Sequence, residues 1–281
     1  MLINAKELLK KAQQKKLAIP AFNVSSLEGV QAVFIAANQT NSPVILETSE
    51  GEAKHMMPEV LVGICKSLEK IFPVDYVIHL DRAKDITFIE KCLQAGYNSF
   101  ACEFGSENYE DNVRDTLQAI KVARRFNAQV EGAVEVVPLR YYKSSFQKEM
   151  IITSPEISKQ YVHDTGVDSF VVSIGTQSGR LKTDEKIKFE VLAEINAVLP
   201  GLPLVLHGGS FLSEEIIRKA INNGIAKINV NSENRIAYTE QLKKNIKNNH
   251  DEYAPYRLLA GVREAMIDIM VKKIKLFNNK Q

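Results

Sequence analysis

Five ionisable side chains stand within or directly after short apolar runs of the chain, where they could carry acid–base or electrostatic chemistry. They are Asp81, Arg82, Glu103, Glu131 and His207. A carboxylate or an imidazole can accept and return a proton during a reaction. An arginine keeps its positive charge and can stabilise negative charge that develops on a substrate oxygen. We therefore predict that these five residues belong to a catalytic centre.

A second set of residues is small, hydroxylated, amide-bearing or basic, and it also follows apolar runs. Glycine lets backbone N–H groups approach an anion closely, and the other members add side-chain donors. Stretches of this kind occur at 173–179, 207–210 and 229–232, which together indicate a phosphate site; tight turns alone are the alternative. The predicted phosphate- or substrate-binding residues are Asn23, Ser49, Gly179, Lys182, Gly208, Gly209, Ser210, Asn229, Asn231 and Ser232.

The elements that must position these residues alternate between short β-rich runs and longer stretches with helical spacing. The eight runs are Leu17–Val24, Pro43–Thr48, Val74–Leu80, Ser99–Cys102, Ala128–Val134, Ser169–Ile174, Leu202–Leu206 and Ala226–Val230. After an N-terminal helix, the helical stretches are Leu27–Asn38, Pro58–Lys70, Ile86–Ala95, Asp111–Phe126, Ser154–Asp164, Lys188–Val198, Glu214–Asn223, Asn234–Lys247 and Tyr256–Phe277. Runs that are apolar on both faces are typical of a parallel sheet buried on both sides.

Eight such βα units predict an α/β fold, a closed (β/α)8 TIM barrel with eight parallel strands. We expect one domain over 1–281, with C-terminal helices at about 234–277 packed on the barrel. An open doubly wound sheet would need a glycine-rich first turn, and the turn at residues 22–26 has no glycine. The segment 136–152 interrupts the alternation and is either a lid or a surface loop. In a TIM barrel the carboxyl ends of the strands meet at one mouth, so both residue sets should lie there.

Composition narrows the class of protein. Hydrophobic residues make up 45% of the chain and charged residues 25%, which is typical of a soluble globular protein and excludes intrinsic disorder. The net charge of +2 argues against a nucleic-acid partner, and the apolar runs are too short to span a membrane. The cysteines Cys65, Cys92 and Cys102 are too few and too scattered for a disulfide framework, which fits the cytoplasm.

These motifs together resemble the class II fructose-bisphosphate and tagatose-bisphosphate aldolases from one end of the chain to the other. The matching stretches are Pro20-Ala21-Phe22-Asn23, Ser42-Pro43-Val44-Ile45, Ser49-Glu50-Gly51 with Lys54, His79-Leu80-Asp81, Thr165-Gly166-Val167-Asp168, Ile174-Gly175-Thr176, Pro203 to Ser210, Lys227-Ile228-Asn229-Val230 and Arg263-Glu264-Ala265-Met266.

The resemblance implies a metal-dependent carbon–carbon lyase. In that family a zinc ion held by three histidines polarises the ketose carbonyl and stabilises an enediolate. An aspartate after the third strand, here Asp81, handles the proton of the aldehyde oxygen. A glutamate on the loop after the fifth strand moves a proton at carbon, and Tyr141 to Ser145 stand there in this chain. The resemblance also implies a sugar-phosphate ligand and a homodimer or homotetramer.

The chain departs from this family at the zinc ligands. Arg82 replaces the second histidine of the family's H-L-D-H motif, and Ser178 replaces the histidine of G-T-x-H-G. Only His207 remains, while zinc needs about three protein ligands, and arginine cannot be one because it stays protonated. We therefore predict no cofactor and no metal, with Arg82 standing in for the ion. His207 would bind a metal only with unfamiliar partners such as Glu103 or Glu131.

Two functions remain open. One is an aldolase-type lyase on a phosphorylated ketose or a substrate like dihydroxyacetone phosphate, working without zinc. The other is an inactive pseudo-aldolase that binds a sugar phosphate as a regulator or partner. A Schiff base on Lys182 or Lys227 is a further possible mechanism. Asp81 could also serve only as the ion-pair partner of Arg82.

Overall fold

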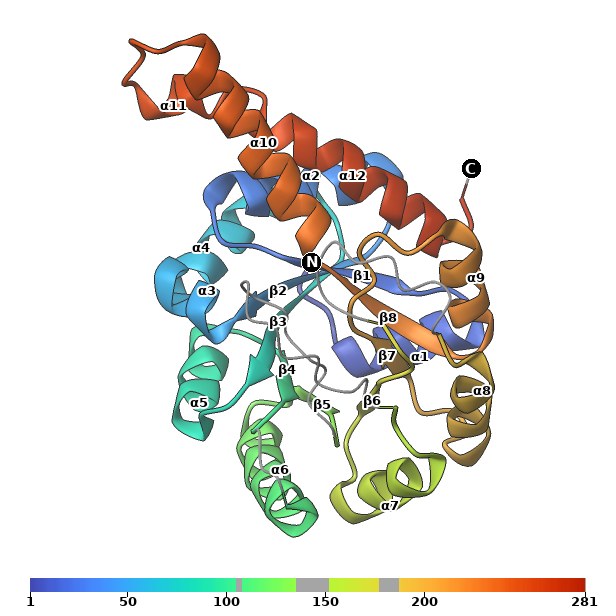
Figure 1. Cartoon of the computed structure of the whole chain (residues 1–281). Coiled ribbons are helices and arrows are strands. Elements are labelled where there is room, and N and C mark those ends of the chain that lie inside the picture. The colour runs from blue at the N-terminus through green and yellow to red at the C-terminus, as the bar shows by residue number, and fades with distance from the viewer. Residues whose placement is uncertain (105–107, 135–151, 177–186, 281) are drawn as a thin grey trace.

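The eight strands close into a parallel barrel, in the order β1 to β8 with β8 returning to β1 (Figure 1). The computed structural model describes residues 1–104, 108–134, 152–176 and 187–280. The strands are β1 Ile19–Asn23, β2 Val44–Ser49, β3 Tyr76–Ala83, β4 Ser99–Cys102, β5 Gln129–Gly132, β6 Ser169–Val172, β7 Leu204–Leu206 and β8 Ile225–Val230. This arrangement confirms the predicted TIM barrel.

Helices follow the strands around the outside of the barrel (Figure 1). They are α1 Ala5–Gln14, α2 Leu27–Thr40, α3 Glu50–Met56, α4 Pro58–Leu68, α5 Ile86–Ala95, α6 Tyr109–Arg125, α7 Pro155–Thr165, α8 Phe189–Val198, α9 Glu214–Asn222, α10 Ser232–Asn248, α11 Pro255–Leu258 and α12 Val262–Phe277. Most predicted elements end within a few residues of these bounds.

Two helical features differ from the prediction. Helix α3 was not among the predicted helical stretches, and it forms because Ser49 and Glu52 make a capping box at its start. The predicted helix Tyr256–Phe277 is two helices, because Gly261 takes a left-handed conformation with φ 75° between α11 and α12.

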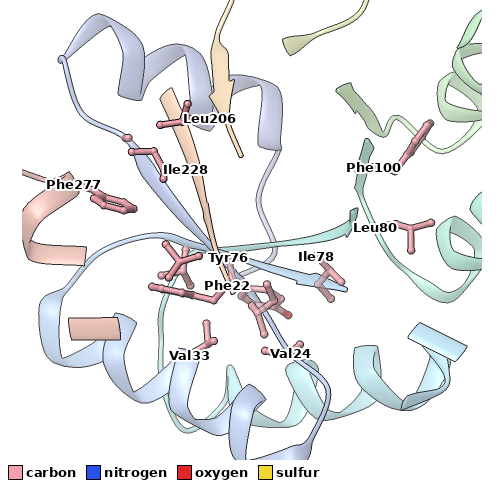
Figure 2. Packing of buried hydrophobic residues seen from close by; sticks show 14 of the residues in the cluster. Phe22, Val24, Val33, Tyr76, Ile78, Leu80, Phe100, Leu206, Ile228 and Phe277 are labelled. Carbon is pink, nitrogen blue, oxygen red and sulfur yellow. The ribbon is translucent and has the colours of Figure 1, made fainter. Parts of the chain in front are cut away.

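The main hydrophobic core lies between the strands and the surrounding helices. Figure 2 shows members of this cluster, among them Phe22 of β1, Val33 of α2 and Phe277 of α12. Helix α12 packs on α2, α9 and β1, and α10 packs on α12. Each fully buried side chain of this size contributes about 1.5–3 kcal/mol relative to an exposed one.

The inner face of the barrel changes from apolar to charged along the strands. In β2 and β3 the register pairs Ile45 with Val77, then Glu47 with His79, then Ser49 with Asp81. Because alternate residues of a strand point to the same face, these three pairs form successive layers inside the barrel. Helix α1 packs its apolar side against the first layer and closes that end. The inward-facing polar residues therefore lie toward the other end, where the strands finish.

The α10–α11 region projects beyond the barrel (Figure 1). Within the part of the chain that the structure covers, no helix combines the length and the apolar character that a membrane span requires. The three cysteines are free and buried.

Candidate active site

The mouth of the barrel brings together three of the predicted catalytic residues. The Arg82 guanidinium donates to Glu103 Oε1 at 3.1 Å, and its Nε lies 3.9 Å from Asp81 Oδ2. All three side chains are largely buried. The register of β3 against β4 shifts between Leu80 and Ala83, and Arg82 has a φ of 53°. A non-glycine residue in this conformation costs about 1–3 kcal/mol, and such strain collects at functional sites.

Asp81 also contacts the predicted phosphate residues. Asn229 Nδ2 donates to Asp81 Oδ1 at 3.4 Å, which joins β3 to β8 across the mouth. The Oδ1 atoms of Asn229 and Asn231 are buried and accept no hydrogen bond from any residue that the structure describes. Asp81 of the predicted catalytic set and Asn229 of the predicted phosphate set therefore lie in contact at the mouth.

The loops after β7 and β8 are held against each other. The Gly209 N–H donates to the carbonyl of Asn229 at 3.2 Å, and the Asn231 N–H donates to Ser210 Oγ at 3.3 Å. A Cβ on Gly209 would lie 2.2 Å from Ile228 Cγ2, so this position requires glycine. Gly208 has a φ of 73°, which also favours glycine. Ser232 follows as the first residue of α10.

Two more of the predicted binding residues, Asn23 and Ser49, lie at the ends of β1 and β2. Both contact Glu52 of α3, which sequence reasoning missed. Glu52 Oε2 accepts from Asn23 Nδ2 at 3.1 Å, from the Ser49 N–H at 2.7 Å and from Ser49 Oγ at 2.9 Å. The pattern S-x-x-E at 49–52 is a capping-box signature, and it could have revealed this contact.

A cluster of charges lies deeper in the barrel, centred on Lys227. Its ammonium donates to Glu131 Oε2 at 2.9 Å, lies 3.5 Å from Glu47 Oε2 and is 3.2 Å from His79 Nε2. Lys227 is 1% exposed. Burial alone would lower the pKa of Lys227, but Glu131, Glu47 and Asp81 raise it above its usual value. A protonated, ion-paired lysine is not a nucleophile, so the geometry argues against a Schiff base on Lys227.

The pKa values of the two buried carboxyl groups around Lys227 are shifted in opposite directions. Burial raises the pKa of Glu47 well above its usual value, and Lys227 opposes this only in part. Burial also raises the pKa of Glu131, but Lys227 and the hydrogen bond with His207 lower it more, to well below the ordinary range. Glu131 is therefore the ionised partner of Lys227, and Glu47 is the group that holds a proton more readily.

The two histidines of the interior have hydrogen-bonding roles. His207 Nε2 lies 3.3 Å from Glu131 Oε1, and its buried Nδ1 has no partner among the described residues. His79 Nδ1 lies 2.6 Å from Ser99 Oγ. Burial, with Lys227 next in effect, lowers the pKa of His79 to about 3. His79 is therefore neutral.

The residues present do not fit the family's three-histidine zinc site. The Arg82 guanidinium is directed at Glu103 and stays charged, so it offers no lone pair to a metal. A different set, Glu47, His79 and Asp81, has ligand atoms that all lie within 4.8 Å of one another. These are ordinary ligand types for a divalent cation. The ammonium of Lys227 already lies beside two of them, and a metal would have to displace it.

Several predicted residues lie outside the residues that the structure describes. They are Gly179, Lys182, the zinc-position Ser178, Tyr141 to Ser145 and nearly all of the segment 136–152. Besides Glu52, sequence reasoning missed Glu47. Its signal was a charged residue at an inward-facing position of an otherwise apolar strand.

The chain is similar along its whole length to known proteins. It matches the family described as "Fructose-bisphosphate aldolase class-II" over residues 3–281. It is 33% identical over 276 residues to the D-tagatose-1,6-bisphosphate aldolase subunit GatY of Klebsiella oxytoca, covering 97% of this chain and 96% of that protein. It is 31% identical over 283 residues to a fructose-bisphosphate aldolase of Geobacillus stearothermophilus, covering 99% and 97%.

A solved structure is also similar to this chain along nearly its whole length. The crystal structure of the YdjI aldolase from Escherichia coli K12 superposes with a TM-score of 0.83 and 28% identity, covering 99% of this chain and 97% of that one. The family match supports an aldolase-type lyase for phosphorylated sugars. On the length of that match, the chain belongs to the class-II fructose-bisphosphate aldolase family.

Proposed function

We propose that this chain is an aldolase-type lyase that cleaves a phosphorylated ketose without the family's zinc ion, with Arg82 in the place of the metal. The observation that carries the proposal is the contact of Asp81 with both Arg82 and Asn229 at the mouth. One carboxylate thereby lies next to a fixed cation and to the residues proposed to hold the phosphate. This is the arrangement that a retro-aldol cleavage requires.

The proposed reaction begins at the hydroxyl on C4 of the ketose. Asp81 accepts the hydroxyl proton, the C3–C4 bond breaks, and its electron pair moves toward the carbonyl oxygen on C2. The Arg82 guanidinium stabilises the negative charge on that oxygen, and the aldehyde product leaves.

The enediolate then takes a proton at C3, and we assign Glu103 as the donor. Burial raises the pKa of Glu103, against the opposing effect of Arg82, so this carboxyl group holds a proton more readily than an exposed one. Asp81 later releases its proton to solvent and Glu103 regains one, which restores the starting state. Glu131 and His207 hold each other and the strands behind this centre.

Metal content and cleavage kinetics test the zinc-free mechanism together. The purified protein is analysed for zinc, and cleavage of phosphorylated ketoses is assayed with and without a chelator. We expect substoichiometric metal and a rate that the chelator leaves unchanged. Stoichiometric zinc with chelator-sensitive cleavage would overturn the zinc-free mechanism and favour a rebuilt metal site such as Glu47, His79 and Asp81. Borohydride with dihydroxyacetone phosphate should trap no lysine adduct.

A pseudo-aldolase is the second candidate function, and one observation favours it. Arg82 is already paired with Glu103 and Asp81, so part of its charge is neutralised before a substrate arrives. Under this alternative the protein binds a sugar phosphate, and calorimetry detects that binding while no cleavage product forms. Product formation that Asp81→Asn abolishes would exclude it.

We also propose that the protein is a homo-oligomer. Tyr256 of α11 is 72% exposed, Tyr253 just before α11 is 91% exposed, and Ile246 of α10 is 51% exposed. Exposed aromatic and aliphatic side chains on a projecting region are typical of protein–protein contacts. Light scattering of the wild type and of a Tyr253→Ser/Tyr256→Ser variant tests this; a wild-type monomer would contradict it.

A further inference from the structure

The donors at the mouth fall into two groups with different surroundings. One group, in and after β7 and β8, contains Ser210, Asn229 and Asn231; the Ser210 hydroxyl accepts from the Asn231 N–H, and among the described residues its own O–H donates to none. The other group, after β1 and β2, contains Asn23 and Ser49, whose donors are directed at a carboxylate of the chain itself. The Ser210 O–H of the first group therefore remains available to an anionic ligand, whereas Asn23 and Ser49 already donate to Glu52.

The carboxylate of Glu52 occupies the position toward which the donors of the second group are directed. Its Oε2 accepts from Asn23 and twice from Ser49, and Arg235 of α10 donates to its Oε1 at 2.5 Å. Four donors are thus directed at one carboxylate, which is 8% exposed. Oxygen acceptors surrounded by amide, hydroxyl and guanidinium donors are also what a phosphate group would find at such a place. Glu52 therefore occupies an anion position that the fold has built.

The two groups lie on opposite sides of the proposed reaction centre. Ser49 is the register partner of Asp81 in β2 and β3, and Asp81 contacts Asn229 of β8. A cavity of about 450 Å³ adjoins the second group and is lined by Asn23, Glu52 and Arg235. A sugar with its phosphate in the first group and its reacting carbons at Asp81 would extend its other end toward Glu52.

We propose that Glu52 is a specificity-determining residue that excludes a second phosphate, so that the substrate is a ketose with a single phosphate and an uncharged, hydroxylated far end. This inference rests on the proposed function and deepens it. A phosphate carries about 1.5–2 negative charges at neutral pH, and placing it beside a buried carboxylate is strongly unfavourable. Sugar hydroxyls, in contrast, can donate to Glu52.

Binding calorimetry with reduced sugars tests this without turnover, because a hexitol lacks the carbonyl and cannot be cleaved. The probes are hexitol 1-phosphate and hexitol 1,6-bisphosphate. We expect the wild type to bind the monophosphate at least about tenfold more tightly than the bisphosphate. In Glu52→Ala the four donors are released, and the preference should reverse. Glu52→Gln removes the charge but keeps an acceptor, so it should only weaken the preference.

The controls separate charge, folding and function. Glu59→Gln removes one negative charge from an exposed site on α4 and should leave the preference unchanged. Circular dichroism and thermal unfolding establish that the Glu52 variants keep their fold despite the altered cap of α3. A wild type that binds the bisphosphate more tightly, or a Glu52→Ala variant with an unchanged preference, overturns this inference and leaves the aldolase proposal standing. A wild type that binds neither probe overturns both.

Discussion

The interior of the barrel and its mouth both bury acids and bases, yet they use them differently. In the interior, Lys227 pairs with the ionised Glu131 and lies beside Glu47 and the neutral His79, and the exposed fractions of all four are 1% or less. At the mouth, Asp81 contacts Arg82 and Asn229, and the Oδ1 atoms of Asn229 and Asn231 have no hydrogen-bond partner in the described part of the chain; in the interior the same holds for the carboxylate oxygens of Glu47. The comparison indicates that the interior charges hold strands together, whereas the mouth keeps polar groups available to a ligand.

The largest expected effect is a loss of activity caused by a change at the mouth. Asp81→Asn removes the proposed base but keeps the shape of the side chain and a possible contact with Asn229. We expect the cleavage rate to fall about 100- to 10,000-fold. The free energy of unfolding should change by less than about 1 kcal/mol. Steady-state kinetics and urea unfolding measure the two quantities. Unchanged activity would remove Asp81 from the mechanism.

A change in the interior should affect stability instead. Lys227→Met leaves the ionised Glu131 buried without its cation, and breaking such a pair costs about 3–5 kcal/mol. Urea unfolding measures the loss. Adding Glu131→Gln to Lys227→Met should recover much of it, because the buried charge is then removed. If Lys227→Met is as stable as the wild type, the interior charges do not hold the barrel.

Gly209, at the mouth, provides a further test of the comparison between the mouth and the interior. In Gly209→Ala the new Cβ would clash with Ile228, and the backbone after β7 must move. We expect a loss of about 1–3 kcal/mol in stability and weaker sugar-phosphate binding by calorimetry. Gly51→Ala is the matched control, because a Cβ there meets nothing within 4 Å and α3 should gain about 0.5–1 kcal/mol. Equal effects in the two variants would contradict the close packing of Gly209.

The smallest expected effect concerns the pH dependence of the interior. The pKa of His79 is about 3 in the folded state, while an unfolded histidine binds a proton below about pH 6.5. Protons therefore favour the unfolded state between these values, and the wild type loses about 1.4 kcal/mol per pH unit through His79 as the pH falls. His79→Gln should lack this loss.

The measurement is the difference in unfolding free energy between His79→Gln and the wild type at pH 6.5 and 5.5. The raised pKa of Glu47 acts in the opposite direction, but Glu47 is present in both proteins, as are Lys227, Glu131 and His207. A difference that does not vary with pH would show that His79 titrates normally.

Much of the site was predictable from the sequence, because a barrel places the ends of its strands together. Asp81, Glu103 and His207 follow or end apolar runs, and this alone was enough to predict that they share a mouth. Period-two alternation then predicts that Glu47 and Lys227 face the same interior. The sequence pattern singled out only Lys227, because Glu47 stands in a run that resembles an ordinary buried strand.

Other features depend on contacts between residues far apart in the chain. The pairing of Glu52 with Arg235, the hydrogen bond of Asn229 to Asp81 and the position of Lys227 between Glu131 and Glu47 join different strands and helices. No local propensity specifies these contacts. They arise from the register of the closed barrel and from the helices that pack against it.

The sequence by itself determined the eightfold alternation, the family resemblance and the loss of two zinc-position histidines, because residue type and spacing are local properties. The tertiary structure alone decided which charges are paired. The free energy of a buried charge depends on the groups within a few ångströms of it, and closure of the barrel sets those neighbours. It thereby made Lys227 a structural cation and placed Glu52 among the donors of Asn23 and Ser49.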